Sequence, residues 1–195
     1  MNNISLFSSQ LTIVNVKENT DYVKSIDFEF LKTNTYFKSY MSKDHKVLNK
    51  FPFLKQIILD HFYKFAKDTL RYQNNFKITT SWITEIEGEY SEFHHHKNSM
   101  FSGVYYFDEY SDDSGHIEFK NPLSCHSDFW LVPNEWNMAN SQSYYIKPHK
   151  NLLIFFPSYL EHRICKNKET RRSLAFNIVP IPPYGHSDSL VDIGK

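Results

Sequence analysis

Three consecutive histidines, His94-His95-His96, precede a run of β-branched and aromatic residues and could bind a metal ion at the start of a strand. Side chains alternate in an extended chain, so His94 and His96 lie on one face and His95 on the other. Two imidazoles on one face can hold a transition metal, but a reactive site needs a further ligand from elsewhere. We therefore predict His94 and His96 as metal ligands and expect a third ligand downstream.

His162 is the best placed of the remaining histidines to complete this site. It follows an apolar run at residues 152–156 that ends in Pro157 and a turn, so it can face inward at the open end of a barrel. Three protein ligands leave coordination positions for substrate and oxygen, whereas closed structural sites normally fill every position. Glu92, on the same strand face as His94, is the alternative ligand if His96 turns away.

An arginine and a serine follow nine and eleven residues after His162. In a strand, Arg171 and Ser173 share a face and Arg172 points away, which favours Arg172 as a solvated charge. A guanidinium binds a carboxylate through two parallel hydrogen bonds, and a hydroxyl adds another. A metal with open positions beside such a pair predicts a small dicarboxylate co-substrate.

Composition excludes several other classes of protein. The chain has 195 residues with 22 basic and 22 acidic side chains, so its charge indicates no polyanionic partner. Only 5 glycines are present, which argues against a glycine-rich nucleotide-binding fold. Two cysteines, Cys125 and Cys165, make no disulfide scaffold. No signal peptide or membrane span is indicated, so we expect a cytoplasmic protein (host cytoplasm if viral).

The periodicity of apolar residues predicts one helix followed by many strands. Three- and four-residue spacings predict an amphipathic helix over residues 53–70, with Pro52 in its first turn. Strands are expected at 4–7, 11–16, 76–86, 101–107, 116–119, 143–147, 152–156 and 173–179. Within the strand at 76–86, one face is expected to carry Phe76, Ile78, Thr80, Trp82, Thr84 and Ile86.

The layout indicates a mainly β (α+β) domain built on a β-sandwich or barrel, with a supporting N-terminal helix. A single domain over 1–195 is expected, with N-terminal strands and helix in 1–75, the β core in 76–180 and a tail in 181–195. Residues 17–48 carry no clear period. Residues 120–142 are interpreted as a long loop in which Trp130 and Trp136 either form a lid or pack.

Ordered motifs between residues 82 and 179 resemble those of the iron(II)/2-oxoglutarate-dependent dioxygenases. In chain order they are His-x-His, Ser-Gly-Val-Tyr-Tyr, Ser-Gly-x-Ile-x-Phe-x-Asn-Pro, Leu-x-Phe-Phe-Pro-Ser-x-Leu-x-His and Arg-x-Ser-x-Ala-Phe-Asn. The chain is most similar to a branch of 2OG-Fe(II) oxygenases found in bacteria and marine phages. This resemblance implies a double-stranded β-helix (jelly-roll) core with the iron near one open end.

The resemblance also implies the site residues and cofactors. His94 and His162 would bind Fe(II), and His96 occupies the position where most of the superfamily has a carboxylate. Arg171, assisted by Ser173, would bind the distal carboxylate of 2-oxoglutarate, as would Tyr106, which matches a tyrosine of the prolyl-hydroxylase relatives. The implied activity is a hydroxylase that couples oxidative decarboxylation of 2-oxoglutarate by O2 to oxidation of a C–H bond.

Two other functions stay open at this point. A three-histidine cupin-type metalloenzyme would work without 2-oxoglutarate, and the neutral His96 motivates it. A non-catalytic jelly-roll module of a virus is the other alternative. For the oxygenase, the primary substrate is expected to be a protein side chain or a small molecule, and nucleic acid is not indicated.

Overall fold

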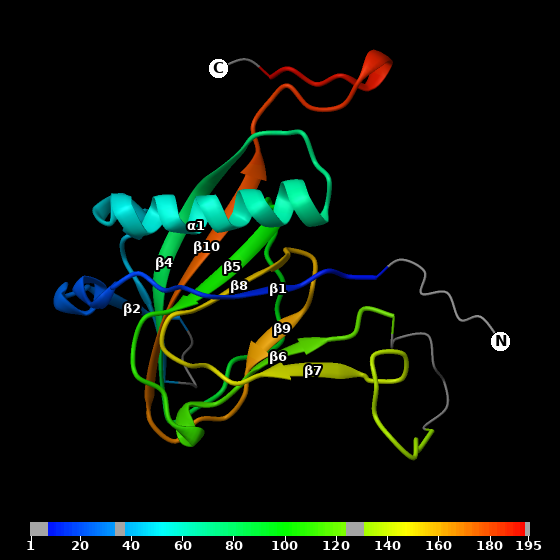
Figure 1. Cartoon of the computed structure of the whole chain (residues 1–195). Helices are drawn as coiled ribbons and strands as arrows, with labels where there is room; N and C mark the ends of the chain where they lie inside the picture. The colour runs from blue at the N-terminus through cyan, green and yellow to red at the C-terminus, as the bar shows by residue number, and fades with distance from the viewer. Residues whose placement is uncertain (1–7, 34–37, 124–130, 194–195) are drawn as a thin grey trace.

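One long helix and two antiparallel sheets form three layers (Figure 1). The computed structural model describes residues 8–33, 38–123 and 131–193. The larger sheet has the strand order β1 (Thr12–Asn15), β8 (Leu152–Pro157), β5 (Phe101–Tyr106), β10 (Thr170–Pro180), β4 (Phe76–Glu87), β3 (Ser39–Ser42) and β2 (Phe30–Lys32). The smaller sheet has the order β7 (Ser143–Ile146), β6 (Ile117–Lys120) and β9 (His162–Ile164).

Helix α1 (Pro52–Lys64) covers the outer face of the larger sheet, as Figure 1 shows. It begins at Pro52, whose fixed φ suits the first turn, and continues into a π-helical turn, η3 (Phe65–Thr69). Its buried side chains recur at three- and four-residue spacings, and the last of them is Phe62. The Phe62 ring meets the rings of Phe76, Phe101 and Phe155 at centroid distances of 5.2–5.5 Å. This aromatic cluster fixes the helix against the sheet that carries the site.

Strand β4 departs from the strict alternation that the sequence predicted. Its pairing with β10 shifts register at Asn177/Ile178, opposite Ile78 and Thr80. One extra residue in one strand of a pair reverses the faces beyond it. Phe76 and Ile78 therefore pack toward α1, and the expectation that they share a face with Trp82, which stacks on His96, was wrong.

Strand β10 lies in the middle of the larger sheet, between β5 and β4. One of its faces is apolar and the other carries mainly polar side chains. Leu174, Phe176 and Ile178 pack in the core beneath α1. The alternating inner face carries Arg171, Ser173, Ala175 and Asn177, so one strand presents a cation at one end and an amide at the other. A second apolar cluster, made by the inner faces of β5 and β8 with residues of β6 and β7, closes the space between the sheets.

Gly103 in β5 allows the close approach of two neighbouring strands. A Cβ atom at this position would overlap the Phe176 ring and lie 2.8 Å from the Ile154 carbonyl oxygen. We expect Gly103→Ala to lower the free energy of unfolding by about 1–3 kcal/mol, the usual cost of overpacking a core. Urea denaturation checks this. Equal stability of Gly103→Ala and the parent protein would contradict the packing.

Several expected elements lie where the sequence placed them, and others do not. Residues 17–48 hold the turns η1 (Asp21–Ser25) and η2 (Val47–Lys50) together with β2 and β3, and β9 forms where only a turn was expected. Two further short turns, η4 (Asp112–Ser114) and η6 (Ser187–Ser189), lie later in the described part of the chain. The expected strand at 4–7, Trp130 and Cys125 fall outside the described residues. No helix in the described ranges is long and apolar enough to cross a membrane.

Candidate active site

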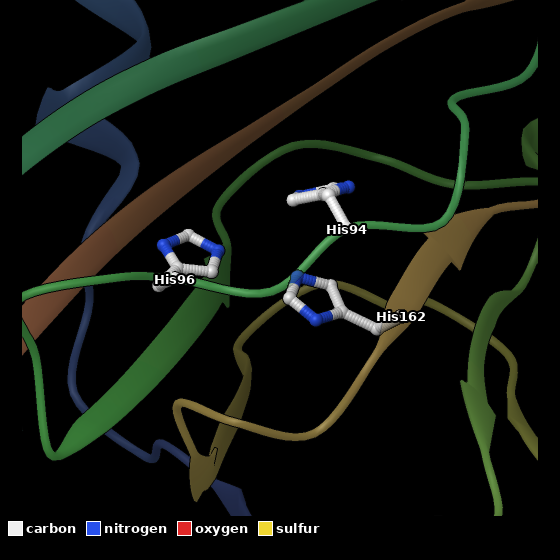
Figure 2. A group of neighbouring side chains, drawn as sticks. All are labelled: His94, His96 and His162. Carbon is white, nitrogen blue, oxygen red and sulfur yellow. The ribbon is translucent and has the colours of Figure 1, made fainter.

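Three histidines meet between the two sheets (Figure 2). His94 and His96 come from the segment that precedes β5, and His162 begins β9. His94 and His162 form an antiparallel β-bridge through both backbone hydrogen bonds, of 2.9 and 3.0 Å. One ligand nitrogen from each of the three imidazoles lies within 4.8 Å of the others. The bridge thus brings together side chains that are 68 positions apart in the printed sequence.

Two of the imidazoles have one ring nitrogen engaged by a backbone carbonyl oxygen. The Nδ1 atom of His94 donates to the Glu92 carbonyl oxygen at 2.9 Å, and Nδ1 of His162 donates to the Leu160 carbonyl oxygen at 3.0 Å. The His96 ring is hydrogen-bonded by the Asn177 side chain. A proton held on one ring nitrogen leaves the lone pair of the other nitrogen free to bind a metal.

Burial keeps two of these imidazoles neutral. His162 is 6 % exposed, and burial together with the neighbouring His94 lowers its pKa to about 3. The pKa of His96 is lowered to about 4, first by burial and then by the charge of His94. Neutral imidazole is the form that binds metal, and desolvation disfavours the charged form. The trio therefore fits a divalent transition metal: its nitrogen donors converge, burial keeps His96 and His162 neutral, and carbonyl oxygens orient His94 and His162.

The lowered pKa values predict acid sensitivity of the metal-free protein. Unfolded histidine takes up a proton below about pH 6.5, whereas folded His96 and His162 resist protonation down to about 4 and about 3. At acidic pH the unfolded state then binds more protons than the folded state, so the free energy of unfolding decreases as the pH is lowered. From pH 8 to pH 5 we expect a loss of about 2 kcal/mol per histidine. Urea denaturation of metal-free protein measures it, and His162→Asn should lose roughly half of the effect; an unchanged slope would contradict the assignment.

A buried guanidinium lies on the same inner face of β10 as Asn177. Arg171 is 2 % exposed, and its Nη2 donates to the Tyr106 hydroxyl at 2.8 Å. Its carbon Cζ lies 5.0 Å from the centroid of the Tyr106 ring. Burial raises the pKa of Tyr106, so this hydroxyl stays protonated and able to donate to an anion.

No carboxylate among the described residues pairs with Arg171, and its Nε has no hydrogen-bond partner there. A buried cation without an anion is costly, and an unsatisfied buried donor of this kind indicates a missing ligand. Ser173 is also buried, two positions along the same face. The guanidinium, the phenol hydroxyl and the serine therefore form a cradle whose chemistry suits a carboxylate.

The remaining predicted positions separate clearly from these two groups. Arg172 lies on the other face of β10, where its Nε donates to the Glu85 carboxylate at 2.6 Å. Within the described ranges, the only group of possible metal-binding side chains is the three histidines, and neither His95 nor Glu92 belongs to it. His95 is exposed, and Glu92 contributes its backbone carbonyl rather than its carboxylate.

Two residues beside the histidines had no role assigned from the sequence. The Trp82 ring stacks on the His96 imidazole with a centroid distance of 5.6 Å and an interplanar angle of 27°. Asn177 contacts the same imidazole from β10. The alternation that placed Arg171 and Ser173 on one face also places Asn177 there, so the signal was present in the sequence.

Comparison with solved structures shows the fold. The chain is similar to HygX from Streptomyces hygroscopicus with nickel and 2-oxoglutarate bound (TM-score 0.57, 10% identity, 88% of this chain and 83% of that chain). It is also similar to a prolyl hydroxylase from Trichoplax adhaerens in complex with a hypoxia inducible factor peptide fragment (TM-score 0.57, 12% identity, 86% and 82% coverage). The mainly β, double-stranded β-helix fold is thereby confirmed. Comparison with curated proteins gives no significant match.

A family model matches the sequence itself. The family described as "Putative 2OG-Fe(II) oxygenase" matches residues 80–177. This range contains both groups of side chains described above, the three histidines and the cradle around Arg171. The expected resemblance and the expected cofactors, Fe(II), 2-oxoglutarate and O2, are confirmed at the level of the family. Because the match spans half of the 195-residue chain, the protein belongs to this family of 2-oxoglutarate- and Fe(II)-dependent oxygenases, which are oxidoreductases.

Proposed function

We propose that this protein is a hydroxylase that uses Fe(II), 2-oxoglutarate and O2 to oxidise a C–H bond of its primary substrate. The observation that carries the proposal is the buried Arg171 guanidinium, which lacks a carboxylate partner in the described part of the chain. It lies on the inner face of β10, the strand that also contacts a histidine of the metal trio. A dicarboxylate that reaches from the metal to the guanidinium would satisfy both.

The metal ligands in this proposal are His94, His96 and His162. Bound there, Fe(II) supplies the coupling of 2-oxoglutarate decarboxylation by O2 to oxidation of the substrate. Three neutral ligands leave a higher positive charge at the site than two histidines and a carboxylate do, which favours anionic 2-oxoglutarate. The protein's own contribution is to bring three imidazoles together and to keep those of His96 and His162 unprotonated.

Arg171, Ser173 and Tyr106 are the proposed residues for the distal carboxylate of 2-oxoglutarate. The guanidinium offers its charge and its partnerless Nε–H, and the two hydroxyls offer further donors. A buried ion pair gains much of its strength from the absence of water around it. The described residues contain no nucleophile with an adjacent base in this region, and the proposed reaction needs none.

The proposed primary substrate is a protein side chain or a small molecule. Among the solved structures of similar fold, the Trichoplax adhaerens prolyl hydroxylase holds a peptide fragment, and HygX has been solved with hygromycin B bound. These proteins, which share little sequence identity with this chain, bind one compound of each class, so experiment must decide between a protein side chain and a small molecule. We also propose that residues 1–195 act as one oxygenase domain, because β1, β2 and β3 extend the sheet that carries the site.

Calorimetric titration of 2-oxoglutarate into protein loaded with Ni(II) or Mn(II), followed by a succinate assay with Fe(II), tests the proposal. We expect stoichiometric 2-oxoglutarate binding that depends on the metal, and succinate that forms only when 2-oxoglutarate is present. Metal binding without 2-oxoglutarate binding would instead support the three-histidine enzyme. Protein that takes up no stoichiometric iron, nickel or zinc would support a non-catalytic module.

A further inference from the structure

Tyr110 lies beside the cradle around Arg171, in the segment that follows β5. Its ring meets the Tyr106 ring edge-on, with a centroid distance of 5.3 Å and an interplanar angle of 89°. The Arg171 guanidinium packs on the same Tyr106 ring, with Cζ 5.0 Å from the centroid. Edge-to-face aromatic pairs are stabilising beyond the area that they bury. Tyr110 therefore restricts the position of the ring whose hydroxyl accepts a hydrogen bond from Arg171.

The Tyr110 hydroxyl takes the place of a strand donor at the start of β10. The pairing of β10 with β5 ends at Leu174. Two residues before Leu174, the Arg172 carbonyl oxygen accepts a hydrogen bond from the Tyr110 hydroxyl at 2.5 Å. Burial raises the pKa of Tyr110, so the hydroxyl keeps the proton that it donates. Because the Arg172 peptide lies between Arg171 and Ser173, this bond holds the backbone of both cradle residues.

A second contact from the same segment reaches the chain just before β10. The backbone N–H and the hydroxyl of Ser111 donate to the Glu169 carboxylate at 3.4 and 3.0 Å. Together with the bond to Arg172, these contacts hold the chain on both sides of Arg171. The guanidinium takes no part in these bonds, so its Nε–H stays available for an anion.

We propose that Tyr110 is a positioning residue for 2-oxoglutarate, because its ring holds Tyr106 and its hydroxyl holds the backbone of residues 171–173. This inference rests on the proposed function, in which Arg171, Ser173 and Tyr106 bind the distal carboxylate. Donors that are fixed before binding lose less conformational entropy when the ligand arrives. Tyr110 needs no contact with the co-substrate to have this effect.

Two 2-oxo acids separate the cradle from the rest of the site. 2-Oxobutyrate is 2-oxoglutarate without its distal carboxylate, so the ratio of their affinities for Ni(II)-loaded protein measures what the cradle contributes. Calorimetric titration gives both affinities. We expect Tyr110→Phe, which loses only the hydroxyl, to reduce this ratio by about 3- to 10-fold. Tyr110→Leu also loses the ring contact and should reduce the ratio by about 10- to 100-fold, with 2-oxobutyrate affinity nearly unchanged.

Tyr145→Phe is the matched control for the loss of a phenol hydroxyl. The Tyr145 hydroxyl donates to the Glu118 carboxylate at 2.8 Å in the smaller sheet, so this variant should keep the parent's ratio. Equal weakening of both 2-oxo acids in the Tyr110 variants would assign Tyr110 a merely structural role. An unchanged ratio in Tyr110→Leu would overturn the proposal. Parent protein that binds no 2-oxoglutarate would instead refute the proposed function itself.

The ring contact can be measured without metal or co-substrate. A ring in a close-packed interior flips only when its neighbours move, and Tyr106 is fully buried. Aromatic carbon-13 NMR of the metal-free protein should show separate or broadened signals for the two edges of the Tyr106 ring in the parent and in Tyr110→Phe. Tyr110→Leu should merge them into one averaged set, and fast averaging in the parent would count against a fixed ring. If Tyr110→Leu fails to fold, an unchanged affinity ratio in Tyr110→Phe would overturn the proposal.

Discussion

Replacing His162 with alanine is expected to abolish stoichiometric binding of Fe(II), Ni(II) or Zn(II). His162 is the most buried member of the trio, and its ring lies 4.5 and 5.2 Å from the His94 and His96 rings. The two remaining imidazoles, which come from one segment, lose the donor that closes the site. The loss of affinity should exceed the 10–100-fold typical of outer partners. Calorimetric titration and metal content after dialysis measure it, and 2-oxoglutarate binding should disappear at the same time.

His95→Ala is the matched control for His162→Ala. It removes an imidazole adjacent to both His94 and His96 in sequence, but His95 is exposed and lies outside the metal-binding group. We expect metal affinity within about twofold of the parent protein. Because His162 also packs on Phe156 and Phe119, circular dichroism must show that His162→Ala is folded. A folded His162→Ala that still binds one metal ion tightly would refute the three-histidine site.

The order of chemically active residues in the sequence predicted much of the site. His94, His96 and His162 do converge, and Tyr106 and Arg171 do touch. These residues could be predicted because histidine, arginine and tyrosine each have a narrow range of chemistry. Each also lies in, or directly follows, a segment whose apolar pattern indicates a strand. The resemblance to a known family, rather than spacing alone, linked Tyr106 to Arg171.

The partners of Asn177 could not be predicted in the same way. Asn177 meets Ser102 because β10 and β5 pair in one particular register, with Asn177 opposite Ser102. It meets Thr80 because the register that pairs Thr170 with Glu87 continues unbroken to Asn177 and shifts only beyond it. Serine, threonine and asparagine are common in strands and turns, so their types alone do not distinguish a buried hydrogen-bond network from exposed polar side chains. Register and bulges are tertiary properties, which a single sequence specifies but does not display.

The helix and the buried strands were predictable for a simpler reason, since their periodicity is set by one packed face. Apolar spacing located the helix of 52–64 and the runs at 101–106 and 152–157. The strands β2, β3 and β9 were not predicted; with three or four residues each they show no period, and the equally short β1, β6 and β7 were recognised only from their β-branched and aromatic residues. Strand β9 matters most among them, because it presents His162 to the site.

Replacing Arg171 with methionine is expected to weaken 2-oxoglutarate binding by about 30- to 1000-fold while metal affinity stays near that of the parent protein. Truncating one partner of a buried, hydrogen-bonded charge pair commonly costs about 2–4 kcal/mol, which corresponds to this range. Methionine keeps the length and apolar contacts of the arginine stem beside the Tyr106 ring. Calorimetric titration of 2-oxoglutarate into Ni(II)-loaded protein measures the change.

The melting temperature of Arg171→Met distinguishes a role of Arg171 in 2-oxoglutarate binding from a role in stabilising the fold. In the parent protein the Arg171 charge is buried without a carboxylate, so its removal relieves a desolvation cost, and Arg171→Met should melt no lower than the parent. Arg172→Met is the matched control on the neighbouring position, because Arg172 pairs with Glu85 on the opposite face and should leave 2-oxoglutarate affinity unchanged. If Arg171→Met instead lowered the melting temperature by several degrees and bound 2-oxoglutarate normally, the arginine would serve the fold, and the co-substrate would have to bind through other groups.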